Sequence, residues 1–405
     1  MSETRVQRPS IEIGVRRVAE LDPGAALPES DPRLVARIAG EIRRNGPMPF
    51  TRFMELALYD PEAGYYTASH GEGEGAAGPG RTGDFLTAPE GHPIFGWAIA
   101  RHLESVWEAL GRPTRFVVRE YGAGTGALAA GILDGLRRAD SGLREAIRYQ
   151  AVDASETRLT ALRRRLDASG LGASLEPFDA RPEAGAVVAN ELLDALPVHR
   201  VEGGLDGALL ERFVTLGVDG AFDTTLGPPS TPALAARLRA EGIELAHGQP
   251  AEICLAIDAW VADATAGLAA GELLLIDYGY PAAELYRPER GSTLRAYHRH
   301  RVHADPLVAI GRQDLTAHVD LTAVGRAAGA AGLAPVGTTT QARFLAALGA
   351  GELLVELQGD PTTDLAGYLE AKSALVRMLD PRVTGGFAVL AFGRELDARA
   401  LRGFA

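Results

Sequence analysis

Short buried runs and helix-period stripes of apolar residues alternate along most of this chain. Runs rich in β-branched and aliphatic residues predict buried strands, and segments with helical spacing lie between several of them. These strands are expected at 116–121, 149–152, 186–189 and 273–276. Because strands that alternate with helices are joined by right-handed crossovers, the pattern predicts an α/β fold with a doubly wound parallel sheet.

Other patterns place elements around this sheet. Apolar residues at helical spacing from Leu34 onward predict helices before it. Alternating runs with glycine turns predict an inserted antiparallel hairpin set at 198–226. The remaining expectations are a short strand near 173–176, a helix around 253–269 and a closing strand pair near 334–336 and 386–392.

The domain organisation follows from these patterns. A proline-containing leader at 1–30 is expected to be mobile, and a helical prefix with a glycine-rich loop is expected at 31–112. The catalytic core is expected at 113–405, with insertions near 198–245 and 280–315. We expect the inserted segments and the glycine-rich run at 71–83 to form a lid over the substrate.

A glycine turn follows the strand at 116–121 and opens the next helix. Gly122, Gly124 and Gly126 allow positive φ angles and let a ligand approach the backbone, which side chains would prevent. The turn also presents the unpaired N–H groups of a helix N-terminus. This combination predicts a nucleotide-type cofactor site.

Two cofactor classes use such a turn. Gly122, Gly124 and Ala127 formally meet the dinucleotide pattern, but the next strand-end acid, Asp153, lies much farther on than the ~20 residues this pattern expects. An acid directly before the glycines, Glu120, and a second acid after the following strand resemble class I S-adenosyl-L-methionine (SAM) methyltransferases. That resemblance implies that Asp153 binds the ribose hydroxyls and that Glu120 helps to hold the methionine end.

Composition excludes several classes of function. The net charge of −12 argues against a protein that binds nucleic acid by neutralising phosphates. The single cysteine, Cys254, excludes an internal disulfide, and its sequence context predicts a buried helix position rather than a nucleophile. No apolar stretch is long enough for a membrane segment, so a cytoplasmic protein is expected.

A segment rich in histidine and arginine suggests metal binding at first sight. Interleaved arginines would surround a bound ion with positive charge, and no carboxylate or cysteine joins at ligand spacing, so no metal is expected. The segment is predicted to be a basic rim, either solvated or in contact with an acidic partner. Its residues are Arg295, His298, Arg299, His300, Arg301 and His303.

Six sequence blocks in one order resemble the MidA family of class I SAM methyltransferases, whose mitochondrial member is a complex I assembly factor that methylates an arginine of a partner subunit. The likeness runs from about residue 32 to 392 and implies a seven-stranded, Rossmann-like core. Ala123 and Thr125 depart from the family's Gly-Pro-Gly-Arg-Gly turn, which leaves the substrate open. The blocks are 64–66, 83–90, the glycine turn, 190–198, 276–279 and 314–320.

Strand-end positions and the resemblance together mark the expected site. Carboxylates after the fourth strand can take two parallel N–H bonds from a guanidinium, although Asn190 and Glu191 could instead cap a helix. The catalytic candidates are Glu191, Asp194 and His318; for His318, a structural role is the alternative to substrate contact or proton acceptance. The cofactor-binding candidates are Asp84, Thr87, Glu120, Gly122, Gly124, Gly126, Asp153 and Asn190.

The predicted function is protein arginine N-methylation with SAM as cofactor and S-adenosyl-L-homocysteine as product. One alternative is a methyltransferase for a small molecule or a peptide natural product. Another is an assembly or scaffold protein that binds SAM without turnover. The expected partner is a protein or peptide acceptor, with a small-molecule acceptor and a homodimer both left open.

Overall fold

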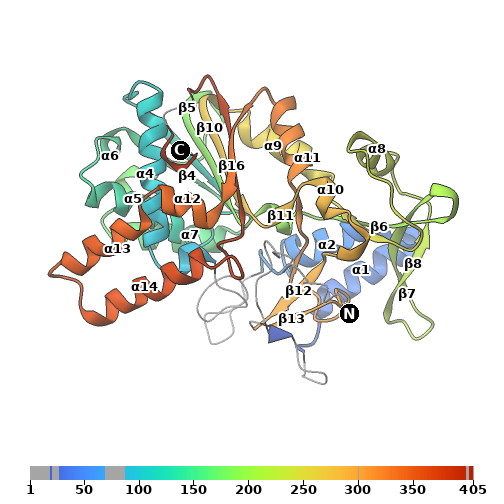
Figure 1. Cartoon of the computed structure of the whole chain (residues 1–405). Helices are drawn as coiled ribbons and strands as arrows, with labels where there is room; N and C mark the ends of the chain where they lie inside the picture. Colours follow the sequence, from blue (N-terminus) through green and yellow to red (C-terminus); the bar gives the residue numbers. More distant parts are fainter. Residues whose placement is uncertain (1–18, 21–26, 69–86, 300, 398–400, 405) are drawn as a thin grey trace, which may run out of the picture.

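The computed structural model describes residues 19–20, 27–68, 87–299, 301–397 and 401–404 (Figure 1). Most of the predicted leader therefore lies outside the described residues. The glycine-rich run at 71–83 and the cofactor candidate Asp84 also lie outside them.

A six-stranded sheet forms the centre of the fold (Figure 1). Four neighbouring strands are parallel, and the closing strand pair is formed, both as the sequence predicted; the closing pair runs antiparallel. The strand order is β16 (Ala334–Thr340), β17 (Ala388–Arg394), β10 (Leu268–Asp277), β5 (Glu183–Asn190), β3 (Phe116–Tyr121) and β4 (Ile147–Val152).

The predicted short strand near 173–176 is not formed, so the described sheet has six strands rather than seven. A 3-10 turn, Gly172–Ser174, replaces most of it, and only Leu175 forms a bridge, to Tyr149 at the edge of the sheet. The chain then reaches Pro177, which has no N–H group to continue a ladder.

Helices cover both faces of the sheet, which confirms the doubly wound arrangement. Alternate residues of β5 face opposite sides: Val188 packs with α4, α5 and α12–α14, and Val187 packs with α9 and α11. These helices are α4 (Ile94–Ala109), α5 (Ala127–Arg138), α6 (Leu143–Ala146), α7 (Glu156–Ala168), α9 (Ala256–Thr265), α11 (Leu321–Ala330), α12 (Gln341–Ala347), α13 (Ala350–Gly359) and α14 (Leu365–Leu379).

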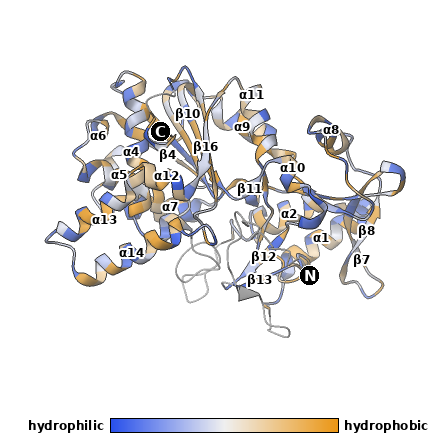
Figure 2. Cartoon of the chain, viewed as in Figure 1, coloured by the Kyte–Doolittle hydropathy of each residue, from blue (hydrophilic) through white to orange (hydrophobic). Residues whose placement is uncertain are grey.

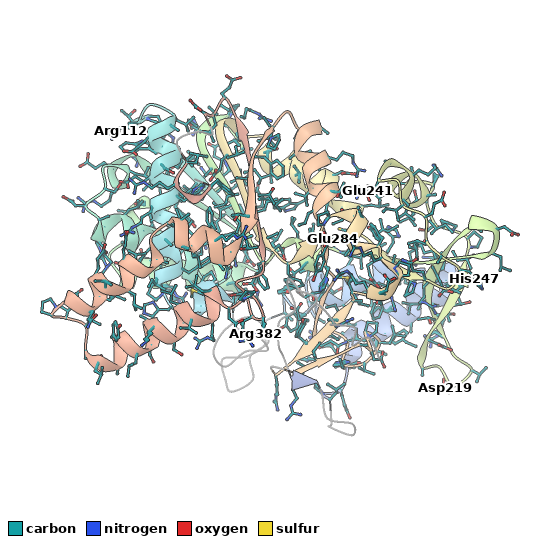
Figure 3. All side chains as sticks on the ribbon, viewed as in Figure 1. Arg112, Asp219, Glu241, His247, Glu284 and Arg382 are labelled. Carbon is teal, nitrogen blue, oxygen red and sulfur yellow. The ribbon has the colours of Figure 1, made fainter. Side chains whose placement is uncertain are left out.

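A second body packs beside the sheet and contains the predicted hairpin set. Phe53 of the prefix shares a buried cluster with Val214 and Leu294 from the two insertions, so three distant segments make one core. Figure 3 shows Asp219 at the far tip of its β7–β8 hairpin. The elements are α1 (Pro32–Asn45), β2 (Met48–Pro49), α2 (Phe50–Tyr59), β6 (His199–Gly203), β7 (Leu209–Leu216), β8 (Phe222–Gly227), α8 (Ala233–Ala240), β9 (Pro250–Ile253), α10 (Ala282–Leu285), β12 (Arg295–His298), β13 (Arg301–His303) and β14 (Asp314–Thr316).

The predicted helix at 253–269 is shorter than expected. Pairing of β9 with β6 keeps the chain extended to Ile253, and α9 begins only at Ala256. Cys254 therefore lies between a strand and a helix, which corrects the expected helical position. Burial raises the pKa of its thiol to about 11, so the nucleophilic thiolate is scarce at neutral pH.

The outer face of α14 carries exposed apolar residues, and orange patches recur along α13 and α14 in Figure 2. Leu365, Leu369 and Val376 are each at least half exposed. The homodimer stays a prediction. In the part of the chain that the structure describes, no helix combines the length and apolarity needed to cross a bilayer.

Candidate active site

A cavity opens at the carboxyl ends of β3, β4 and β5, where ligands of open α/β sheets bind. Its lining comes from the glycine turn, the strand ends, α3 (Ala88–Gly91), α7 and the end of α2 with the turn that follows. Seven predicted residues line it: Thr87, Glu120, Gly122, Gly124, Asp153, Asn190 and Glu191. Gly126, Asp194 and His318 are not part of this lining.

The glycine turn has the backbone that its residues predict. Gly122, Gly124 and Gly126 all have positive φ angles, of 71°, 53° and 81°. A Cβ on Gly122 would lie 2.8 Å from a methyl carbon of Leu192, whereas a Cβ on Gly124 would meet no heavy atom nearer than 4.0 Å. The open side of Gly124 therefore faces the space that a ligand can occupy.

Asp153 ties this turn to the end of the neighbouring strand. One carboxylate oxygen accepts the backbone N–H of Gly124 at 2.8 Å, and the other accepts that of Ser155 at 2.9 Å. A carboxylate offers about four lone-pair sites, so further acceptor capacity remains for ribose hydroxyls.

Glu120 is buried beneath the turn, with 3% of its surface exposed. Tyr149 donates a hydrogen bond of 2.6 Å to its Oε2. Burial raises the pKa of Glu120 to about 8, and the nearby carboxylates Asp153 and Glu90 add to this shift. The carboxyl group is therefore largely protonated at neutral pH when the cavity holds no cation.

Asn190 and Glu191 follow β5 directly into the cavity. Glu191 has a positive φ of 51°, and its Oε1 accepts long hydrogen bonds from Asn190 Nδ2 at 3.3 Å and from Ala88 N–H at 3.4 Å. The Oδ1 atom of Asn190 is buried and accepts no hydrogen bond from the described residues. A buried acceptor without a donor is costly, so a ligand N–H or O–H is a suitable partner.

Asp277, at the end of β10, holds the loop that carries these residues, and sequence reasoning had noted it only as a strand end. Its Oδ2 accepts the backbone N–H groups of Leu192, Leu193 and Asp194 at 3.1, 2.8 and 3.2 Å. Burial raises the pKa of Asp277 well above its usual range. The position of Asp277 at the end of β10, the parallel neighbour of β5, was the sequence feature that could have indicated this role.

Asp277→Ala should lower the free energy of unfolding by about 2–4 kcal/mol, because it leaves several buried N–H groups without an acceptor. Thermal or urea unfolding measures this change. The matched control is Asp219→Ala, which removes one exposed bond to Ala221 N–H at the hairpin tip and should change stability by less than about 1 kcal/mol. Equal losses in the two variants would contradict the anchoring role of Asp277.

Two catalytic candidates, Asp194 and His318, do not line this cavity. Asp194 is buried, and its backbone carbonyl accepts the N–H of Ala317 at 2.9 Å. His318 lies against the rings of Tyr278 and Tyr280, each with a centroid distance of 5.5 Å. Burial lowers the pKa of His318 to about 3, so its imidazole is neutral at physiological pH. Catalytic roles for both residues stay predictions.

Several lining residues were given no role in the site from the sequence. Thr125 donates a 2.7 Å hydrogen bond to Glu90, which joins the glycine turn to α3 and gives one departure from the family pattern a structural role. Tyr59, Tyr66 and Arg158 also line the cavity. The block at 64–66 had flagged Tyr66 by resemblance, but no chemical role was assigned to it.

The described residues contain no cluster of three or more histidine, cysteine, aspartate or glutamate side chains that could hold a metal ion. Within the basic segment, a ring nitrogen of His298 lies 3.1 Å from the carbonyl oxygen of Arg312. The ring of His298 therefore has a hydrogen-bond partner in the backbone.

The cavity fits SAM, which carries a sulfonium and an amino group. Among its lining side chains are the carboxyl groups of Glu90, Glu120, Asp153 and Glu191. The open side of Gly124 and the donor-free oxygen of Asn190 add room and an acceptor. A parallel sheet with a cavity at this turn, and an acid at the end of the neighbouring strand, is the arrangement expected for a class I SAM-dependent methyltransferase.

Comparisons with known proteins agree with this class. The family described as "Putative S-adenosyl-L-methionine-dependent methyltransferase" matches residues 98–339, and the chain belongs to this family. A crystal structure of a Burkholderia thailandensis protein bound to S-adenosyl-homocysteine is 38% identical, with a TM-score of 0.83 and coverage of 94% of this chain and 98% of that one. SAM is therefore the cofactor, and the resemblance drawn from the sequence is confirmed.

Curated relatives are more distant in sequence. The Drosophila melanogaster "Protein arginine methyltransferase NDUFAF7 homolog, mitochondrial" is 28% identical, with 79% of this chain and 76% of the relative covered. The human protein arginine methyltransferase NDUFAF7 is 27% identical, with 81% and 77% covered. Both relatives are named as mitochondrial proteins, which contradicts the cytoplasmic location expected from the sequence.

The affinity for S-adenosyl-L-homocysteine should rise with pH up to about 8, by as much as about tenfold per pH unit. The raised pKa of Glu120 is the reason, because a ligand amino group favours the ionised carboxyl and binding then releases a proton. Calorimetry between pH 6 and 8.5 measures this slope. Glu120→Gln should flatten it, and an equally steep slope in that variant would exclude Glu120 as its source.

Proposed function

We propose that this methyltransferase transfers the methyl group to an arginine side chain of a protein acceptor. The observation that carries the proposal is the shared cavity, whose lining includes both Asn190 and Glu191 and the glycine turn. Carboxylate and amide oxygens are suited to the parallel N–H groups of a guanidinium. The names of the curated relatives support the same acceptor class.

The chain's own residues would divide the work. Gly124, Asp153 and Glu120 hold the cofactor, and SAM when bound supplies an electrophilic methyl group. Glu191 localises the guanidinium charge, directs one nitrogen toward the cofactor and takes up its proton. Holding the nitrogen close to the methyl group contributes much of the rate. Removal of the proton is also needed, because a guanidinium that keeps its proton is a poor nucleophile.

The second body is proposed to act as the substrate lid. It supplies Tyr59 and Tyr66 to a cavity whose other wall comes from the sheet. Tyr59 donates a 3.0 Å hydrogen bond to the carbonyl of Ala195, in the loop that carries Glu191. Closure of such a lid would exclude water from the reacting groups.

Labelled SAM, added with the protein to a cell extract from which the protein has been removed, tests the acceptor class. We expect label in protein and ω-methylarginine after acid hydrolysis. Label confined to small molecules would overturn the proposal in favour of a small-molecule methyltransferase. Binding of SAM without transfer to any component would instead support the scaffold alternative.

A further inference from the structure

Two tyrosines form a stacked pair on the wall of the cavity. Tyr59 ends α2 and Tyr66 follows it in the next turn, and their ring centroids lie 5.6 Å apart with an angle of 22° between the planes. The pair is fixed at both hydroxyls, since Tyr59 bonds to the carbonyl of Ala195 and Tyr66 donates to Asp314 Oδ1 at 2.7 Å. The rings therefore present a rigid aromatic surface to the cavity.

The surroundings of this pair favour a cation. Burial raises the pKa of both tyrosines, and the charges of Asp314 and Asp194 add to this shift, so both phenols stay neutral at physiological pH. The Asp314 carboxylate lies next to the pair, because it accepts the hydrogen bond from Tyr66. The face of a neutral phenol ring is negative and attracts cations, particularly the planar guanidinium.

One guanidinium already lies on this surface. The Cζ atom of Arg158 lies 5.2 Å from the centroid of Tyr66, and its side chain lines the cavity. Among the described residues this side chain forms no ion pair with a carboxylate. Within the described part of the chain, the contact with Tyr66 is therefore a cation–π contact without a competing ion pair, which an incoming guanidinium with carboxylate partners can replace.

We infer that Tyr59 and Tyr66 form the acceptor-binding wall, which selects a guanidinium over a neutral group, and that Arg158 occupies this wall until the acceptor displaces it. The inference rests on the proposed arginine acceptor and names the residues that determine its specificity. Tyr66 provides the ring face, and Arg158 competes with the acceptor for it.

A binding experiment tests the wall without relying on turnover. The probes are Nα-acetyl-L-arginine amide and its neutral isostere Nα-acetyl-L-citrulline amide, titrated into the full chain saturated with S-adenosyl-L-homocysteine. We expect the arginine probe to bind more tightly than the citrulline probe. Tyr66→Leu should reduce that preference by about 3- to 30-fold, and Tyr66→Phe, which keeps the ring, should retain most of it.

Arg158→Met should tighten binding of the arginine probe several-fold and leave the affinity for S-adenosyl-L-homocysteine within about twofold. The control is Arg112→Met, because Arg112 also lies over an aromatic ring, that of Trp107 at 5.7 Å, but is paired with Glu108 and lies outside the cavity lining, beyond the C-terminal end of α4 (Figure 3). This control should change neither affinity.

Equal binding of the two probes by the wild-type protein would overturn the inference. So would weaker binding of the arginine probe by Arg158→Met, or a matching loss of cofactor affinity, which would make Arg158 a cofactor contact. These failures are separate from failure of the proposed function. Methylarginine in the extract experiment together with unselective probe binding would retain the arginine acceptor and reject the wall.

Discussion

Glu191→Gln should lower the rate of methyl transfer by roughly 10²–10⁴ and leave cofactor affinity within a few-fold. The substitution preserves size and much of the hydrogen bonding but removes the charge that localises the guanidinium proton. Because glutamine tolerates the φ of 51° about as well as glutamate does, added backbone strain is small. Single-turnover transfer and calorimetric binding of S-adenosyl-L-homocysteine measure the two quantities separately.

Glu284→Gln is the matched control, since Glu284 lines no part of the cavity and should transfer at the wild-type rate. A Glu191 variant that loses cofactor binding in step with activity would make Glu191 a cofactor or structural residue. A Glu191 variant with wild-type transfer would favour a structural role, since the structure gives Glu191 no part in capping the following 3-10 helix, and would argue against an arginine acceptor held by this carboxylate.

Gly124→Val should abolish measurable binding of S-adenosyl-L-homocysteine. Its side chain would project into open space on the cavity side, where the nearest heavy atom to a new Cβ is 4.0 Å away. The φ of 53° adds strain for a β-branched residue, of about 1–3 kcal/mol. Calorimetry gives the loss of binding, and thermal unfolding reports whether the variant folds.

Gly242→Val is the control that separates the effect of backbone strain from obstruction of the cofactor cavity. Gly242 also has a positive φ, of 67°, and a Cβ there would meet no heavy atom within 4 Å, but it lies outside the cavity lining. This variant should lose similar stability and keep its cofactor affinity. A folded Gly124→Val protein that binds the cofactor normally would exclude this face of the turn as the binding surface.

The buried strands and the glycine turn were readable from local pattern, because strand burial and turn chemistry are encoded over a few residues. The placement of Glu120 and Asp153 at the same cavity was predictable from topology, since neighbouring parallel strands end at the same edge of a sheet. The cofactor class came from the same positions. The glycine turn and the two strand-end acids were therefore sufficient to predict membership of the methyltransferase family.

The errors arose where a local preference competed with longer-range structure. A strand near Leu175 was predicted from its pattern, yet Pro177 and the preceding 3-10 turn leave a single bridge. Cys254 was assigned to a helix because its neighbours are apolar, but β9 pairs with β6 and keeps that segment extended. Register and pairing of this kind depend on partners far away in the chain.

Local sequence patterns were sufficient to predict most of the buried strands, the turn and the strand-end acids, because each depends on nearby residues. Which side chains reach the cavity depends on how distant segments pack in the folded protein. Tyr66 and Asp314 form a 2.7 Å hydrogen bond although most of the chain separates them. Asp194 and His318 belong to strong sequence motifs but do not line the cavity. Side-chain direction follows from how the prefix and the insertions pack together, and no local pattern encodes that packing.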